Sequence, residues 1–435
     1  NLHILLSHIL FIVMTKYIFP PEFIFGTAVA SYQVEGGIYN NDWTHWENKS
    51  KTVCNEPCNE ACKHFELVDN DIALLKDLGI KAFRFSIEWS RVEPQKGKYD
   101  QISIDHYIQK ANKLIDEGII PIITFHHFTT PEWLAQDGYW ASINTADAFV
   151  KYVERMMNEL PKEIKYFNTI NEPGIFSMFG YFSKEKFPPG IRNEEIFLKT
   201  SDNIIDAHKR ALKVIKSINK YAKVGMTHAL HEWDDSDKSV FNRYLKYHLE
   251  DKFFFASEDD DFIGLQTYSI KRTSPNLVYR SIAWLLIKVP LFRNKLFPIF
   301  LDKFSGRNDY VAANARKTKM GYEYRPEAVK YNLHRIHDKF PDKDIFITEN
   351  GIATDDDNER IQFVKEVLKD IHSYEKVNGR VIGYLYWSLL DNFEWDLGYE
   401  MNFGLIEVNK STYERIPHPS AKWFGSVSAT NSFTD

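Results

Sequence analysis

The chain has 435 residues, of which 44% are hydrophobic and 26% charged, so it can bury a large core. That length exceeds an ordinary single domain and suits one barrel with insertions, because a parallel α/β barrel needs about 250 residues. The net charge is −6 and both signs are mixed along the chain, which gives no electrostatic support for nucleic-acid binding.

The first thirteen residues are almost wholly apolar, from Leu2 to Val13. This stretch is too short to span a bilayer, and it lacks a basic leading segment and a clear small-residue cleavage site. Met14 looks like the natural start of the protein. We therefore expect a single domain over residues 14–435, with residues 1–13 as an extension outside the fold. A membrane anchor is the less favoured alternative.

Three cysteines, Cys54, Cys58 and Cys62, recur every fourth residue and are followed by His64. A metal site is one interpretation, but zinc motifs usually use more closely spaced cysteines, and Pro57 interrupts the run. We therefore expect three thiols near the start of a helix and no metal site. So few cysteines, and an odd number of them, fit a reducing compartment, which favours a cytoplasmic protein.

Strands and amphipathic helices alternate along most of the chain. The expected strands are residues 23–30, 82–87, 119–125, 166–170, 223–227, 262–266, 345–348 and 381–387. The expected helices between them include residues 64–78, 104–117, 144–160, 201–217, 326–337 and 358–375. Such alternation produces parallel βα units, and eight of these units close a barrel. The sequence therefore predicts an α/β fold with a single (β/α)8 TIM barrel.

Residues 272–320 interrupt the alternation after the sixth predicted strand. This stretch is rich in apolar, aromatic and basic side chains, and its apolar run around residues 281–290 is too short to cross a bilayer. We expect a helical βα-loop insertion that packs beside the mouth of the barrel. A helix lying on a membrane surface is the less favoured alternative.

Two glutamates follow the fourth and the seventh predicted strands. Glu172 stands in the motif of residues 169–173 (Thr-Ile-Asn-Glu-Pro), and Glu349 in residues 347–351 (Ile-Thr-Glu-Asn-Gly). The carboxyl ends of all strands of a parallel barrel open onto one face, where active sites lie. Two carboxyls on one rim suit hydrolysis of a glycosidic bond, although a strand-end glutamate can also be a surface ion-pair partner.

With three further motifs, these glutamates make the chain resemble glycoside hydrolase family 1, the retaining β-glucosidase and β-galactosidase family. The motifs are Phe-Gly-Thr-Ala with Ser-Tyr-Gln-Val-Glu-Gly within residues 25–36, Phe-Arg-Phe-Ser-Ile-Glu-Trp-Ser-Arg at 83–91, and Tyr-Trp-Ser-Leu-Leu-Asp-Asn-Phe-Glu-Trp at 386–395. They occur in family order, and the resemblance covers residues 19–424. It implies an exo-acting β-glucosidase-type hydrolase that releases terminal unphosphorylated β-D-glucosyl residues, or galactosyl or fucosyl residues, without a cofactor.

The resemblance also implies roles for individual residues. Glu349 would attack the anomeric carbon, and Glu172 would protonate the departing oxygen and later deprotonate the incoming water. Arg84 would keep Glu349 ionised, because an adjacent cation favours the charged form, and Tyr268 would orient Glu349 by a hydrogen bond. The alternatives are a core ion pair for Arg84 and a packing role for Tyr268. The implied sugar-binding residues are Gln33, His127, Asn171, Trp387, Glu394 and Trp395.

Three details of these motifs bear on the sugar. Glu394 is a carboxylate that relatives acting on 6-phosphorylated sugars lack, and it would repel a phosphate, so neutral glycosides are implied. Phe128 replaces the usual Trp, and Gln266 begins a Gln-Thr-Tyr sequence where the family usually has Asn-Tyr-Tyr. Adjacent His126 and His127 would point to opposite faces of a strand, which argues against a metal site between them.

Two other functions remain open from the sequence. A transglycosylase would pass the same sugar to an alcohol or sugar acceptor, which a hydrophobic 272–320 loop could favour. An inactive sugar-binding barrel is the other alternative, and the presence of both glutamates argues against it. The expected partners are small β-glycosides or oligosaccharides and no nucleic acid. The natural aglycone, the ranking of sugars and the oligomeric state are not determined by the sequence.

Overall fold

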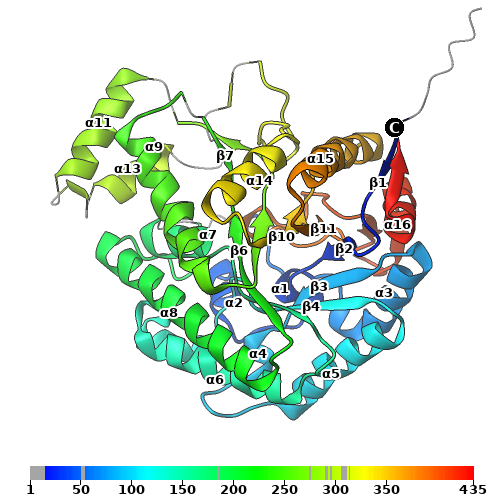
Figure 1. The fold of residues 1–435 in the computed structure, drawn as a ribbon. Helices are drawn as coiled ribbons and strands as arrows, with labels where there is room; N and C mark the ends of the chain where they lie inside the picture. Colours follow the sequence, from blue (N-terminus) through cyan, green and yellow to red (C-terminus); the bar gives the residue numbers. More distant parts are fainter. Residues whose placement is uncertain are drawn as a thin grey trace, which may run out of the picture.

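Eight parallel strands form a closed barrel in a computed structural model of the protein (Figure 1). The structure describes residues 15–49, 54–183, 186–234, 236–273, 276–289, 292–293, 296–304, 311–312 and 314–435. The barrel strands are β2(Ile24–Ala28), β3(Ala82–Ser86), β4(Ile120–His126), β5(Tyr166–Asn171), β6(Lys223–Ala229), β8(Phe262–Gln266), β10(Asp344–Asn350) and β11(Val381–Trp387). Neighbouring barrel strands follow chain order, and β11 closes the barrel by pairing with β2. The predicted (β/α)8 TIM barrel is confirmed.

Helices surround the barrel (Figure 1). The longer ones are α3(His64–Leu78), α5(Gln101–Asp116), α6(Ile143–Glu159), α8(Glu194–Ile218), α11(Leu277–Lys288), α14(Ala328–Lys339), α15(Asp357–Asn378) and α16(Pro419–Thr430). Shorter helices are α1(Ser31–Glu35), α2(Asp42–Glu47), α4(Trp89–Val92), α7(Pro173–Ser177), α9(Val240–Lys246), α10(Lys252–Phe254) and α13(Phe297–Phe304). Single turns of 3₁₀ or π type lie at Glu132–Asp137, Tyr139–Ala141, Met178–Phe182, Tyr247–Asp251, Phe255–Asp259 and Trp395–Leu397.

Three pairs of short strands lie outside the barrel. β1(Lys16–Ile18) pairs with β14(Ser432–Thr434), β12(Ile406–Val408) with β13(Arg415–Pro417), and β7(Glu232–Trp233) with β9(Ile270–Lys271). The first pair joins the two ends of the described chain. The segment 1–13 and Met14 lie outside the described residues, so the expectation about them stays a prediction.

Helix boundaries follow side-chain caps that the periodicity alone did not locate. The prediction began α8 at residue 201, but Asn193 caps it seven residues earlier by accepting a hydrogen bond from the backbone N–H of Ile196. Asp100 similarly caps α5 through the N–H of Ser103. A side chain that accepts from the first helical turn satisfies an otherwise unpaired donor, so it fixes the start of the helix.

Among the described residues, the buried hydrophobic side chains form two clusters, because the barrel strands are covered on both faces. Every residue of β3 is buried, as is every residue of β2, β5 and β8. Strands of this kind appear in the sequence as short apolar runs rather than as an alternation. Packing between strands is close at Gly26, where a Cβ would lie 2.4 Å from the carbonyl oxygen of Ala82.

The insertion after the sixth barrel strand contains the helices α11 and α13, as predicted, and Figure 1 shows them beside α9 at the upper left. Tyr279 of α11 and Phe300 of α13 both contact the ring of Phe241 in α9, at centroid distances of 5.6 and 6.0 Å. Ile270 before the insertion and Met320 at its end line the main pocket. Within the described part of the chain, no helix has the length and apolar character that a membrane span requires.

The cysteines near the start of α3 have separate partners. The thiol of Cys58 donates to the carbonyl oxygen of Tyr32 at 3.1 Å, and the thiol of Cys62 to that of Asp391 at 3.2 Å. His64 bonds Asp71 through Nδ1 at 2.7 Å. In the described part of the chain, no three His, Cys, Asp or Glu side chains are grouped as a metal site would require.

Candidate active site

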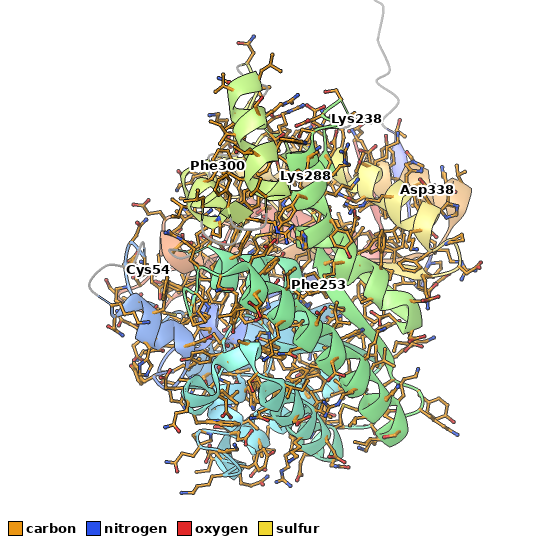
Figure 2. All side chains as sticks on the ribbon, turned by 90° about the vertical axis from the view of Figure 1, so that its left-hand side faces the viewer. Cys54, Lys238, Phe253, Lys288, Phe300 and Asp338 are labelled. Atoms are coloured by element: carbon orange, nitrogen blue, oxygen red, sulfur yellow. The ribbon has the colours of Figure 1, made fainter. Side chains whose placement is uncertain are left out.

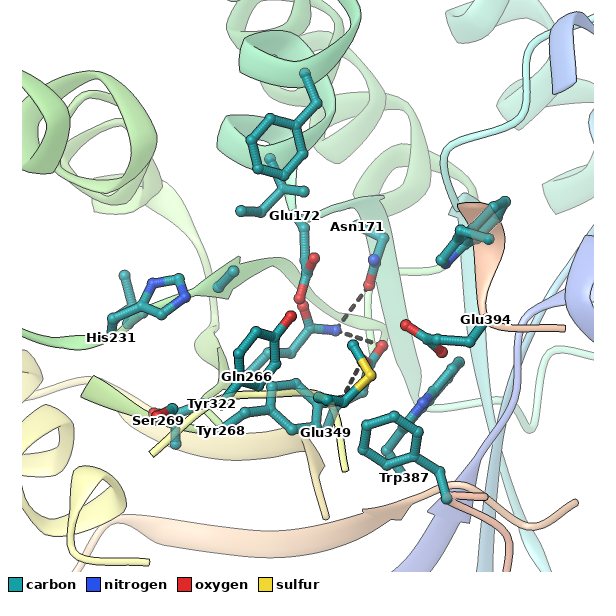
Figure 3. A pocket seen from close by; sticks show the side chains of 18 of the residues that line it. Asn171, Glu172, His231, Gln266, Tyr268, Ser269, Tyr322, Glu349, Trp387 and Glu394 are labelled. Atoms are coloured by element: carbon teal, nitrogen blue, oxygen red, sulfur yellow. Dashed lines mark hydrogen bonds between the residues drawn. The ribbon is translucent and has the colours of Figure 1, made fainter. Parts of the chain in front are cut away.

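A pocket lies at the carboxyl ends of the barrel strands, and Figure 3 shows it from close by. All but one of the predicted site residues line this pocket: Gln33, His127, Asn171, Glu172, Tyr268, Glu349, Trp387, Glu394 and Trp395. The exception is Arg84. The structure therefore brings together side chains that are up to 362 positions apart in the sequence.

Glu172 lies at a sharp turn between β5 and α7. Its backbone is left-handed, with φ 42° and ψ 58°, and Pro173 occupies the first turn of α7. A non-glycine residue in this region costs about 1–3 kcal/mol, and such strain gathers at functional sites. The turn is further constrained at Gly174, where a Cβ would lie 1.7 Å from the carbonyl oxygen of Leu249. The backbone conformation at Glu172 and the close packing at Gly174 thus position the Glu172 side chain in the wall of the pocket.

Burial raises the pKa of Glu172 well above its ordinary value. The negative charge of Glu349 raises this pKa as well, while the charge of Arg84 lowers it and that of Glu394 raises it. Of the two glutamates, Glu172 is therefore the one whose surroundings favour the protonated form more strongly.

Glu349 is the second-last residue of strand β10, and the pairing of β10 with β8 shifts register between Ile347 and Glu349. Its Oε1 accepts from the guanidinium of Arg84 and from Nε2 of Gln266 at 2.6 Å. Its Oε2 accepts from the hydroxyl of Tyr268 at 2.9 Å (Figure 3). Burial raises the pKa of Glu349 above its ordinary value, and the Arg84 charge and the hydrogen bonds from Arg84 and Tyr268 offset part of this rise. Of the two glutamates, Glu349 is the better stabilised anion.

Arg84 lies on β3 and is fully buried. Besides Glu349, it donates from Nε to Thr124 at 3.0 Å and from Nη2 to the Oδ1 of Asn171 at 2.7 Å. The predicted ion pair between Arg84 and Glu349 is present. The guanidinium thereby fixes the position of the carboxylate and of the amide next to Glu172.

Asn171 has a defined amide orientation. Its Oδ1 accepts from Arg84, from Nε2 of Gln266 at 2.7 Å and from Thr227 at 3.0 Å, so its Nδ2 faces Nε2 of His127 at 3.2 Å. Burial lowers the pKa of His127 well below its ordinary value, and nearby cationic groups lower it further. His127 is therefore neutral, with Nε2 as acceptor and the proton on Nδ1.

Gln33 connects the first motif to the last. Its Nε2 donates to Oδ1 of Asn392 at 3.0 Å and to the carbonyl oxygen of Phe393 at 2.7 Å, and lies 3.4 Å from Oε2 of Glu394. Three atoms of the pocket lining are buried without a partner among the described residues: Oε1 of Gln33, Nδ1 of His127 and Oε1 of Gln266. Buried polar atoms are nearly always hydrogen-bonded, so these three are suited to bind a polar ligand.

Aromatic rings form one wall of the pocket. The ring of His127 is roughly parallel to those of Trp387 and Trp395, at centroid distances of 5.9 and 6.1 Å. Phe128, with a left-handed φ of 71°, contacts Trp395 at 5.1 Å. His126 points away from this wall and packs between Trp140 and Phe176, each at 5.0 Å, as the alternation of a strand predicts.

Sequence reasoning missed two parts of the site. Gln266 was noted as a departure from a motif but not as a site residue, although it bonds both Asn171 and Glu349. Its position as the last residue of β8, beside the rim, could have indicated this. The outer pocket was predicted only as a contribution of the 272–320 insertion, which supplies Val311 and Met320, and its other lining residues were missed; these include Ile175, Phe179, Lys186, His231 and Tyr322. Ile175 and Phe179 lie in the short helix α7 and the turn that follows it, and the others lie in loops, so the sequence offered no long periodic signal for them.

A (β/α)8 barrel with two carboxyls in one pocket, one of them paired with a buried arginine, beside aromatic rings and buried polar atoms without partners among the described residues, has the site of a glycoside hydrolase. A model of the family described as glycosyl hydrolase family 1 matches residues 15–257 and 243–433. The chain belongs to glycosyl hydrolase family 1, and the resemblance seen in its motifs is confirmed.

Relatives and solved structures agree with this family. Beta-glucosidase A of Acetivibrio thermocellus is 32% identical over 456 residues, which cover 97% of this chain and 100% of the relative. A 6-phospho-beta-galactosidase of Staphylococcus epidermidis is 29% identical, covering 94% and 98%. The solved beta-glycosidase from Pyrococcus horikoshii superposes with a TM-score of 0.83 at 30% identity and covers 97% of each chain.

Proposed function

We propose that the protein removes terminal β-D-glucosyl residues from unphosphorylated glycosides with retention of configuration, Glu349 being the nucleophile and Glu172 the acid and base. The observation that carries this proposal is that the charged form is stabilised at Glu349 and the protonated form is favoured at Glu172. Arg84 and Tyr268 stabilise the charge of Glu349, whereas burial and the charge of Glu349 raise the pKa of Glu172. One carboxyl is thus prepared to attack and the other to donate a proton.

The reaction then takes two steps. In the first, Glu349 forms a bond to the anomeric carbon as the glycosidic bond breaks, and the departing oxygen takes the proton of Glu172. In the second, Glu172 accepts a proton from water, whose oxygen displaces Glu349 from the same carbon. Two inversions give net retention. Arg84, Gln266 and Tyr268 hold the carboxylate of Glu349 during both steps.

The sugar-binding groups are the three unpartnered atoms of Gln33, His127 and Gln266, together with Asn171 and Glu394, while Trp387 and Trp395 offer apolar ring surfaces. Asn171 would meet the 2-hydroxyl, since it precedes the acid and base directly. Glu394 favours a neutral 6-hydroxymethyl group, because a carboxylate repels a phosphate. This favours the specificity of the named beta-glucosidase relative over that of the 6-phospho-beta-galactosidase.

The protein is proposed to act in the cytoplasm as a single domain within residues 14–435. The buried thiols of Cys58 and Cys62, each hydrogen-bonded to a backbone carbonyl, suit a reducing compartment.

Initial rates on p-nitrophenyl glycosides test the proposed substrate. The panel comprises the β-glucoside, β-galactoside, β-fucoside, β-mannoside, α-glucoside and the 6-phosphorylated β-glucoside. The proposal predicts the highest kcat/KM on the unphosphorylated β-glucoside and no turnover of the α-anomer. Faster turnover of the phosphorylated substrate would refute the role given to Glu394, and α-glucosidase activity would refute the reaction itself.

A further inference from the structure

The helix α11 is apolar on two opposite faces. Ala283, Leu286 and Ile287 are buried and form its inner face. On its outer side, Leu277 is 77% exposed, Val278 68%, Ile282 44%, Trp284 51% and Leu285 43%. An apolar helix on a globular protein usually directs its apolar stripe to the core and polar residues to solvent. A contiguous group of exposed large apolar side chains instead indicates an interaction site.

This outer face is held in place by interactions on the inner side. Arg280 of α11 pairs with the buried Asp237 at 3.1 Å, and Arg293 pairs with the buried Glu194 at 2.6 Å. Aromatic contacts of Tyr279 with Phe241 add to this attachment. Because buried partners orient the insertion, the outward direction of Trp284 and its neighbours is a stable property of the fold.

The charge of the insertion is opposite to that of the rest of the protein. Residues 276–304 contain five Lys or Arg and one Asp, and a positive excess remains after Arg280 and Arg293 are matched with Asp237 and Glu194, whereas the whole chain has a net charge of −6. Lys288, at the end of α11, is exposed close to this apolar face (Figure 2). Trp, Leu and Ile side chains next to an exposed cation such as Lys288 are typical of helices that lie in the interface of an anionic membrane.

Another copy of this chain or an acidic partner protein would be attracted by the same cations. A bilayer fits better, because the exposed apolar residues are spread along the length of α11, and Figure 1 shows this helix at the edge of the molecule. We propose that the outer face of α11, with the exposed Leu296 and Ile299 next to it, docks on the surface of an anionic lipid bilayer. This proposal does not depend on the catalytic roles given above.

Sedimentation of the full chain with lipid vesicles tests the proposal. Vesicles of phosphatidylcholine with about one third phosphatidylglycerol are compared with vesicles of phosphatidylcholine alone, at low and at high salt. The test variant combines Ile282→Ser, Trp284→Ser and Leu285→Ser. The control variant combines Ile102→Ser, Tyr221→Ser and Val377→Ser, which are exposed apolar residues elsewhere, at 79%, 75% and 82%. Turnover of p-nitrophenyl β-glucoside and the melting temperature show that both variants are folded.

The proposal predicts that the wild type and the control variant sediment with the anionic vesicles and that salt weakens this binding. The test variant should bind at least about tenfold more weakly, since interfacial binding scales with buried apolar area. Equal binding by the test variant, no binding by the wild type, or equal binding to neutral vesicles would overturn it. Light scattering without lipid would also overturn the proposal if it showed a dimer for the wild type and the control variant but not for the test variant. The face would then bind a second copy of the chain.

Discussion

The hydroxyl of Tyr268 donates to Oε2 of Glu349 at 2.9 Å, and Tyr268→Phe removes that donor while leaving the ring in place. A hydrogen bond to a charged group contributes about 1.5–3 kcal/mol. If this bond stabilises the ionised nucleophile, its loss reduces kcat/KM by roughly 10- to 100-fold, since each 1.4 kcal/mol is a factor of ten. The pKa of Glu349 should rise, because the lost bond favours the charged form.

The assay is the pH profile of kcat/KM on p-nitrophenyl β-glucoside. The acidic limb, which reports ionisation of the nucleophile, should move to higher pH in Tyr268→Phe. Tyr384→Phe is the matched control, because the hydroxyl of Tyr384 donates to the uncharged Oδ1 of Asn350 at 2.9 Å. That variant should lose some stability and leave the acidic limb unchanged. An unmoved acidic limb in Tyr268→Phe, or an equal movement in both variants, would refute the reasoning.

Three further substitutions have defined outcomes. Glu172→Gln should slow the hydrolysis of substrates with poor leaving groups by about 10²–10⁴-fold. It should spare the first step for dinitrophenyl glycosides, and burst kinetics would then show that the glycosyl-enzyme accumulates. Equal losses of rate on both kinds of substrate would contradict an acid role. Arg84→Met should reduce the free energy of unfolding by about 3–5 kcal/mol, because it leaves the buried Glu349 without its ion-pair partner, and it should also lower kcat/KM; unchanged stability with near-normal steady-state rates would contradict this. Gly351→Ala should reduce the free energy of unfolding by about 1–3 kcal/mol in urea titration, since its Cβ would lie 2.1 Å from the carbonyl oxygen of Trp387; unchanged stability would show that the backbone there can move.

The sequence was sufficient for the barrel because each of its strands is buried on both faces. Short apolar runs such as the one in β3, alternating with amphipathic helices, leave few other arrangements. It was less informative at helix ends, where the start of α8 depends on the cap by Asn193. A cap is a single side-chain contact, and residues of the same type occur in many loops without forming one.

The candidate site was predictable to the extent that its side chains lie at strand ends. Glu172 and Glu349 could be placed on one rim from topology, and Arg84 could be paired with Glu349. The side chain of Gln266 connects Asn171 and Glu349 by hydrogen bonds. Such a connection depends on distances across the barrel, and these distances cannot be inferred from the motif in which Gln266 occurs. An exposed apolar face on α11 was considered only as the less favoured alternative of a helix on a membrane surface, because an apolar helix of that length fits a buried position equally well.

The most direct test of the central claim is mass spectrometry of the enzyme after inactivation with a 2-deoxy-2-fluoro-β-glucosyl substrate. The fluorine slows both steps, and a leaving group that is easily lost lets the glycosyl-enzyme accumulate. The account predicts one added sugar per chain, attached to the peptide that contains Glu349. A label on Glu172 or Glu394, or inactivation without any covalent sugar, would contradict it.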